Sequence, residues 1–146
     1  MGYKLGVAEV LKECSEITGN GSREKKIAYL HKHSHAALKA VLGFCYDPVV
    51  EWMLPEGKPP YRAQPKEQDL QSTLYADFRK LHIFVRSQEY HKLSKVKREN
   101  LFVQFLESLD PDDAELIVAI KDRELPYKGI TIKLIQEAFP NISKNW

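Results

Sequence analysis

The spacing of apolar residues is the feature that most restricts how this chain can fold. In one segment after another they recur every three or four residues, as Leu74, Phe78, Leu81 and Val85 do. This spacing places them on one side of an α-helix, whereas a half-buried β-strand requires strict alternation. No segment alternates convincingly, so the sequence predicts an all-α fold.

Residues that favour helix starts divide this pattern into separate helices. The clearest start is residues 110–113, where an aspartate cap is followed by proline and by two acids that complement the helix dipole. Ser22, Ser34 and Ser94 are further expected caps. Asp47-Pro48 predicts another start, leading into a short apolar helix over residues 49–54.

Together these signals predict one compact domain of about seven or eight helices. The expected helices cover residues 5–17, 36–45, 49–54, 70–85, 95–109 and 111–121. A further helix after the Ser22 cap should bury Ile27 and Leu30, and a last helix should run from the Thr131 cap to Phe139-Pro140. The domain spans residues 1–146, with its core in residues 5–140, a proline-rich loop over 55–71 and a short tail over 141–146.

The overall composition indicates a globular protein without a membrane span. Of its 146 residues, 43% are hydrophobic and 29% charged. No run approaches the roughly 18 apolar residues of a membrane span, and the N-terminal segment lacks the apolar run of a signal peptide. A cytoplasmic protein with free thiols at Cys14 and Cys45 is therefore expected. The net charge of +2 does not indicate nucleic acid by itself, so an electrostatic argument has to rest on clusters of charge.

A basic loop leading into a short apolar helix, residues 123–135, is the first such cluster. Gly129 marks a turn and Thr131 is the expected cap of the next helix. A helix start offers free N–H groups and a positive dipole end to an anion, and Lys128 and Lys133 add cations beside it. The alternative is an ordinary glycine turn between packed helices, with surface lysines.

The densest basic cluster precedes the helix expected after Ser94. It consists of His91, Lys92, Lys95, Lys97 and Arg98. Cations near the first turn of a helix oppose its dipole, so a sequence selected for stability alone would favour acids there. A phosphate-facing role and a solvated charged turn both remain open for this cluster.

Two other segments contain residues that could bind a ligand, but neither shows a recognised binding motif. The proline-rich loop carries Tyr61 and Arg62, which are weaker candidates for a binding role. The three histidines of residues 31–35 alternate, but alternate residues of a helix point in different directions, so a helix corner fits them better than a metal site.

No recognised catalytic or nucleotide-binding motif is present. The sequence lacks a Walker A loop, GxGxxG, HExxH and GxSxG. No pair of carboxylates or nucleophile–base pair is placed together by the sequence. We therefore expect a protein without enzymatic activity, without a cofactor and without a metal.

Several stretches are similar to segments of one protein family. They are residues 23–30, 38–46, 81–93 and 100–119, together with Arg123-Glu124-Leu125, Gly129-Ile130-Thr131 and Ala138-Phe139-Pro140. Taken together, roughly residues 5–140 resemble the N-terminal DNA-binding domain of ATP-dependent DNA ligases, particularly the type encoded by T-even-like bacteriophages. The resemblance implies a helical body that grips duplex DNA through its backbone and minor groove, with Gly129 and Thr131 near phosphate.

The chain contains no KxDG adenylation motif, so the resemblance implies a freestanding DNA-binding module, possibly phage-encoded and linked to replication or repair, acting in the host cytoplasm. The expected partner is duplex DNA, bound without sequence preference. The expected DNA-binding residues are Lys92, Lys95, Lys97, Arg98, Lys128, Gly129, Thr131, Lys133 and Arg62. The alternative is a protein-interaction module, or a phage regulator of a host protein, that retains the fold without binding DNA and shows an exposed apolar patch. The sequence leaves the oligomeric state open.

Overall fold

The structure, a computed structural model, describes residues 5–65, 68 and 70–143. Within them the chain forms seven α-helices and one 3-10 helix: α1 (Val7–Ser15), α2 (Ser22–Lys32), α3 (Ala36–Tyr46), α4 (Gln71–Asp77), η1 (Phe78–Phe84), α5 (Lys95–Glu107), α6 (Pro111–Lys121) and α7 (Ile132–Ala138). Extended pairing in the same residues is limited to one antiparallel bridge, between Trp52 and Val85. The prediction of an all-α fold is confirmed.

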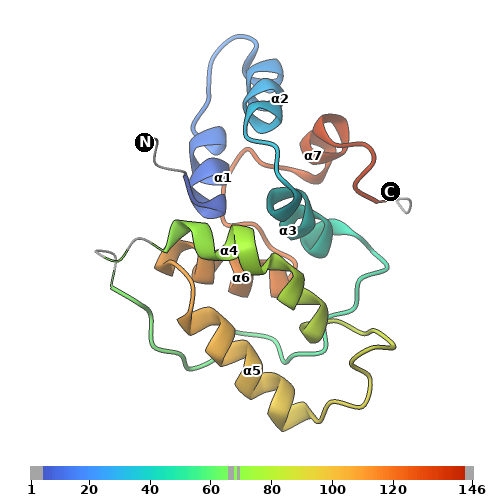
Figure 1. The fold of residues 1–146 in the computed structure, drawn as a ribbon. Helices are drawn as coiled ribbons and strands as arrows, with labels where there is room; N and C mark the ends of the chain where they lie inside the picture. Colours follow the sequence, from blue (N-terminus) through green and yellow to red (C-terminus); the bar gives the residue numbers. More distant parts are fainter. Residues whose placement is uncertain (1–4, 66–67, 69, 144–146) are drawn as a thin grey trace.

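The helices share one hydrophobic core. α3 packs on α6, α4 and η1, while α1 packs on α2 and α6, and α2 packs on α7. Figure 1 shows α3 near the centre of the molecule, with α1, α2 and α7 above it and α4 and α5 below it. Every α-helix contributes buried apolar side chains to a single cluster, among them Leu11, Leu30, Leu38, Leu74, Leu106, Ile117 and Ile135. The described residues therefore form one compact domain.

Three of the expected helix caps are present, because each depends on a hydrogen bond made within a few residues. The Ser94 hydroxyl accepts from Lys97 N at the start of α5, and the Asp110 carboxylate accepts from Asp112 N at the start of α6. Thr131 Oγ1 accepts from Leu134 N at the start of α7. These bonds satisfy amide groups that have no partner inside the helix.

Two other expected caps are wrong by one residue. Helix α2 begins at Ser22, and its cap is Gly21, whose left-handed backbone (φ 72°) suits glycine. Helix α3 is capped by His35 rather than Ser34, since His35 Nδ1 accepts from Ala37 N at 2.9 Å. A histidine cap is uncommon, and the edge-on contact of its ring with Tyr75 of α4 explains how the ring is held in place.

The predicted helix over residues 49–54 does not form. Trp52 instead pairs with Val85, flanked by hydrogen bonds from Met53 N to Phe84 O and from Arg86 N to Glu51 O, both 2.8 Å. The Trp52 indole donates to Phe44 O at 3.0 Å. Contacts with distant parts of the chain thus override a local helix signal.

The helix expected over residues 70–85 changes its winding along its length. It is an α-helix to Asp77 and a 3-10 helix over Phe78–Phe84. Leu74, Leu81 and Val85 are buried as expected, while Phe78 is only partly buried. The proline-rich segment before it forms no helix up to Pro65, as predicted. None of the described helices is long and apolar enough to cross a membrane.

Candidate nucleic-acid interface

The segment that leads into α7 is anchored to the core on both sides of an exposed lysine. Ile130 is buried, and the partly buried Tyr127 packs against the core. Burial, with smaller contributions from nearby acids, raises the pKa of the Tyr127 phenol to about 12, so this ring stays neutral. Lys128 and Gly129 lie exposed between the two anchors. The backbone therefore presents Lys128 to solvent from a fixed position.

Gly129 is favoured by its backbone conformation, and Lys26 lies close to it. Its φ of 86° is in the left-handed region, which other residues rarely adopt. A Cβ atom at this position would lie 2.6 Å from Lys26 Nζ. The same Lys26 Nζ donates to Gly129 O at 3.1 Å, so a cation of α2 lies directly over the turn.

Thr131 acts mainly as a cap. Its hydroxyl accepts from Leu134 N at 3.2 Å, so one of the amide groups expected to face a phosphate already has a partner. Helix α7 has only seven residues and therefore a small dipole. The positive charge of this region consequently comes from lysine side chains rather than from the helix start.

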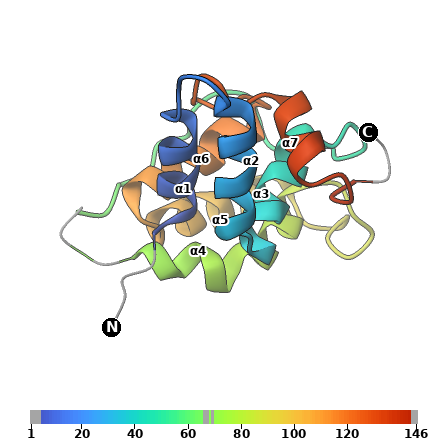
Figure 2. The ribbon, with the colours of Figure 1, turned by 90° about the horizontal axis from the view of Figure 1, so that it is seen from above.

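A second contact fixes α7 against α2. Arg23 of α2 forms an exposed ion pair with Glu137 of α7, at 2.5 Å between Nη2 and Oε2. We call the surface formed by Lys26, Lys128, Gly129, Thr131 and Lys133 the α2–α7 face. Within the described part of the chain, its three lysines form no ion pair. Figure 2 views the molecule from the side on which α2 and α7 lie.

The second predicted cluster loses one of its members. Arg98 is only 5% exposed, and its guanidinium donates to Ile83 O at 3.1 Å and to Tyr90 O at 2.8 Å. The prediction that Arg98 is exposed and faces DNA is therefore wrong, because its side chain is buried and links α5 to the segment before it. Lys92, Lys95 and Lys97 remain exposed and form no ion pair among the described residues.

The two lysine clusters lie at opposite ends of the molecule. Figure 1 shows the start of α5, which carries Lys95 and Lys97, at the bottom, and α7, which carries Lys133, at the top. The structure does not bring all the predicted DNA-binding residues onto one patch. Each cluster is a separate candidate for phosphate contact.

Arg62 belongs to neither cluster. Its backbone N donates to Glu107 Oε2 at 2.7 Å, at the end of α5 opposite Lys95. The neighbouring Tyr61 is partly buried, and Lys58 Nζ lies 5.4 Å from the centre of its ring. An acid beside Arg62 makes this loop a weaker phosphate site than either lysine cluster.

The three alternating histidines have three separate structural roles. His31 donates from Nε2 to Ala138 O at 2.6 Å, His33 packs at a tilt against the Tyr29 ring, and His35 caps α3. In the residues that the structure describes, no three His, Cys, Asp or Glu side chains are placed to hold a metal ion. Both cysteines are buried free thiols, and burial raises the pKa of Cys14 to about 11 and that of Cys45 to about 12.

Sequence reasoning missed the role of Lys26. Lys26 lies on α2, and its side chain reaches over Gly129, which is 103 positions away in the chain. No local signal predicts such a contact. The sequence also gave no indication of a groove beside α3, described below.

Fold and surface together define an all-helical protein with two exposed lysine clusters. Residues 10–127 match the model of a family of unknown function (DUF6433), and the chain belongs to this family. No curated protein and no solved structure showed a significant match to the chain.

Proposed function

We propose that this protein binds duplex DNA through its phosphate backbone, without sequence preference and without a catalytic step, and that the α2–α7 face is the contact surface. The observation that carries the proposal is the hydrogen bond from Lys26 to Gly129 O. This bond places Lys26 as a third cation beside Lys128 and Lys133. The turn that carries Lys128 and Gly129 is exposed to solvent. Clustered lysines on a rigid turn favour phosphate, because each contact releases a condensed counterion.

The resemblance to the DNA-binding domain of ligases supports the same region, since it implies phosphate near Gly129 and Thr131. The polar groups of the α2–α7 face are lysines, backbone and one capping hydroxyl, and we assign them to phosphate oxygens rather than to base edges. Contacts of this kind position a protein on DNA without conveying sequence. Binding should therefore depend on duplex shape and charge.

The test is fluorescence anisotropy with a labelled duplex over roughly 50 to 200 mM salt. Three phosphate contacts predict a slope of log affinity against log salt of about −3. Lys128→Glu with Lys133→Glu should weaken binding by on the order of tenfold or more and reduce the slope by about two.

Lys95→Glu with Lys97→Glu is the matched control, because it makes the same change of charge on an exposed helix start at the other end of the molecule. If this control weakens binding more than the α2–α7 double variant, the contact surface is at α5 and our assignment is wrong. If wild-type protein does not bind at the lowest salt, the DNA proposal fails altogether.

The form of DNA preferred would indicate the process served. A nicked duplex, an intact duplex and a single strand of the same sequence can be compared in this assay. Preference for the nick would favour a role in repair or replication, as the ligase resemblance implies. Preference for the single strand would contradict duplex recognition.

A further inference from the structure

Two buried oxygen atoms from different helices lack a hydrogen-bond donor. Asp113 of α6 is 1% exposed, and within the described residues neither its Oδ2 nor the buried Oε1 of Gln71, in α4, has a hydrogen-bond partner. Both side chains lie against Gly6, since a Cβ atom there would be 3.3 Å from Asp113 Oδ2 and 3.3 Å from Gln71 Cγ. A buried acceptor without a donor costs free energy, and one hydrogen between these two atoms would satisfy both.

The carboxyl group of Asp113 can supply this hydrogen itself. The titratable groups that surround it among the described residues are acids or phenols, and none of them donates to Oδ2. They belong to α1, α4, α6 and the segment before α7: Glu9, Tyr75, Asp110, Asp112 and Tyr127. Burial is the main cause that raises the pKa of Asp113 to about 7; the nearby acids add to it, and the bond from Ala8 N opposes it. A protonated carboxyl group has one O–H to donate, whereas a carboxylate only accepts.

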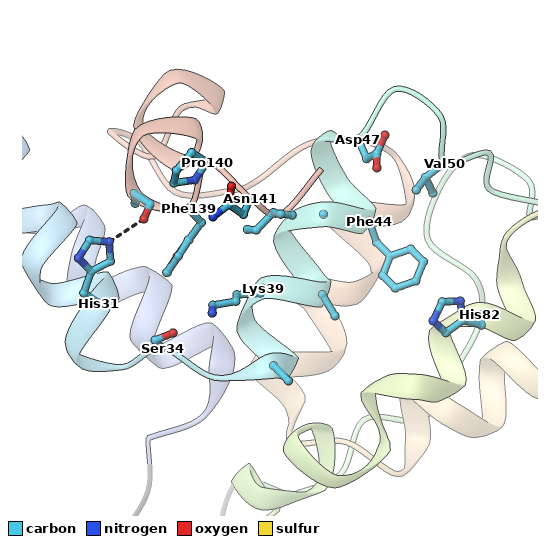
Figure 3. A pocket seen from close by; sticks show the side chains of 15 residues that line it. His31, Ser34, Lys39, Phe44, Asp47, Val50, His82, Phe139, Pro140 and Asn141 are labelled. Carbon is cyan, nitrogen blue, oxygen red and sulfur yellow. Dashed lines mark hydrogen bonds between the residues drawn. The ribbon is translucent and has the colours of Figure 1, made fainter. Parts of the chain in front are cut away.

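Gln71 is the first residue of α4, and the start of this helix lacks a side-chain cap. Leu70, at the cap position, forms no side-chain hydrogen bond there within the described part of the chain. Helix α4 packs on α1 and α3 and continues directly into η1. Figure 3 shows the far end of η1, where His82 lies beside Phe44 of α3 at one end of a groove of about 790 Å³. The two ring centroids are 5.2 Å apart, so ring packing holds that end. A bond from Gln71 to α6 would hold the other end.

We propose that Asp113 is protonated at Oδ2 in the folded protein and donates this proton in a hydrogen bond to Gln71 Oε1, which forms a pH-sensitive latch between α6 and the start of α4. Oδ1 keeps its bond from Ala8 N. When the carboxyl group releases the proton to solvent, the bond is lost and a carboxylate faces a carbonyl oxygen, so the start of α4 separates from α6 more often. The latch does not depend on DNA binding, because none of its residues belongs to the α2–α7 face.

The first readout is the pKa of Asp113, measured by NMR from its carboxyl carbon and assigned by the loss of that signal in Asp113→Asn. Gln71→Met keeps the length of the side chain and removes the carbonyl acceptor. The variant loses a bond that only the acid form makes, so the pKa of Asp113 should fall by about one pH unit. Gln104→Met is the matched control, because it makes the same change at an exposed position of α5 and should leave this pKa unchanged.

Two results of this titration would overturn the latch. An unchanged pKa of Asp113 in Gln71→Met would mean that the two side chains share no hydrogen bond. A raised pKa would mean that the Gln71 NH₂ group donates to the ionised carboxylate, which is the opposite arrangement.

The second readout is hydrogen exchange of the α4 amides, expressed as opening constants after correction for the pH dependence of the chemical exchange. Loss of the bond on opening predicts that the opening constant of the wild type rises about tenfold between about pH 5 and 8. In Asp113→Asn the side-chain amide can donate to Gln71 Oε1 at every pH, so opening should stay low. In Gln71→Met opening should be about tenfold higher than in the wild type at pH 5 and should change little with pH. The same rise with pH in Gln71→Met as in the wild type would show that α4 opens independently of this bond and would overturn the proposal.

Discussion

Arg123 and Asp113 both join distant segments through hydrogen bonds to the backbone, yet their surroundings differ in an instructive way. Arg123 is exposed, and its guanidinium donates to Cys45 O, Asp47 O and Val50 O. Asp113 is 1% exposed; its Oδ1 accepts from Ala8 N at 2.8 Å, and its Oδ2 has no hydrogen-bond partner. The exposed charge is well matched to acceptors, whereas the buried charge is only half satisfied.

The difference follows from the number of partners that each site supplies. Three carbonyls near the end of α3 match the several N–H groups of a guanidinium. Around Asp113 the neighbours include Glu9 and Asp110, and the Gln71 amide oxygen is a second buried acceptor without a donor. A carboxylate that lacks donors is stabilised by taking up a proton instead. The two sites should therefore differ in their dependence on pH.

The largest expected effect is a loss of stability as pH rises, caused by Asp113. Burial, opposed by the bond from Ala8 and aided by Asp110, Glu9 and Asp112, raises the pKa of Asp113 from 3.8 to about 7. The folded state then holds a proton that the unfolded state has lost. The contribution of Asp113 to the free energy of unfolding should fall by about 3 kcal/mol between pH 4 and 7 and stay low above pH 7.

Urea unfolding of wild type and Asp113→Asn over this range separates Asp113 from the other titrating groups. The asparagine variant keeps an acceptor for Ala8 N and cannot ionise. Its stability should match that of the wild type near pH 4 and exceed it at pH 8. Parallel pH profiles for the two proteins would show that Asp113 does not titrate in this range.

The second effect concerns Arg123 and should not depend on pH between 5 and 8. Arg123→Ala removes three charge-assisted bonds and should lower the free energy of unfolding by about 2 kcal/mol. Its φ of 64° is unfavourable for any residue with a Cβ atom. Arg123→Gly should therefore be less destabilising than Arg123→Ala by about 1 kcal/mol, although it removes the same bonds.

Chemical denaturation of both variants at pH 5 and at pH 8 measures this difference and its dependence on pH. Equal losses for Ala and Gly would mean that the backbone at residue 123 relaxes without cost. A loss that grows with pH in either variant would contradict the contrast with Asp113.

The features predicted correctly from sequence are those set by neighbouring residues. The caps at Ser94, Asp110 and Thr131 and the stripes of buried leucines depend on spacing within a few positions. These signals were sufficient for the all-α class and for most helix positions.

The features that were missed depend on contacts across the chain. Arg98 has the sequence context of a surface residue, but Ile83 and Tyr90 supply carbonyls that draw it inward. Residues 49–54 carry a helix signal and nevertheless pair with the segment around Val85. The position of Lys26 over Gly129 joins residues 103 apart. Such partners are visible only in the folded chain, so the candidate site could be predicted only in part.

A smaller effect is expected at Gly6, which lies against Asp113. A Cβ atom on Gly6 would lie 3.3 Å from Asp113 Oδ2, Gln71 Cγ and Glu9 Oε1, although its backbone (φ −66°) suits alanine. Gly6→Ala should therefore cost about 1 kcal/mol, from crowding rather than from backbone strain. In an Asp113→Ala background the cost should shrink, because the nearest carboxylate is gone. Thermal unfolding of the two single variants and of the double variant measures the coupling energy between Gly6→Ala and Asp113→Ala. If the two losses of stability are strictly additive, crowding against Asp113 is not the cause.

The smallest effect is expected for the ion pair between Arg86 and Glu51, which lies across the Trp52–Val85 bridge. The pair is short, 2.6 Å between Nε and Oε2, and the Arg86 bond lowers the pKa of Glu51, but both side chains are exposed. Backbone bonds from Met53 and Arg86 hold the same two segments without it. Exposed pairs contribute little and are screened by salt. The Arg86→Ala variant should thus unfold at nearly the same denaturant concentration as the wild type, and any difference should disappear at high salt. A larger loss of stability that persists at high salt would mean that this exposed pair, like Arg123, helps to hold the fold.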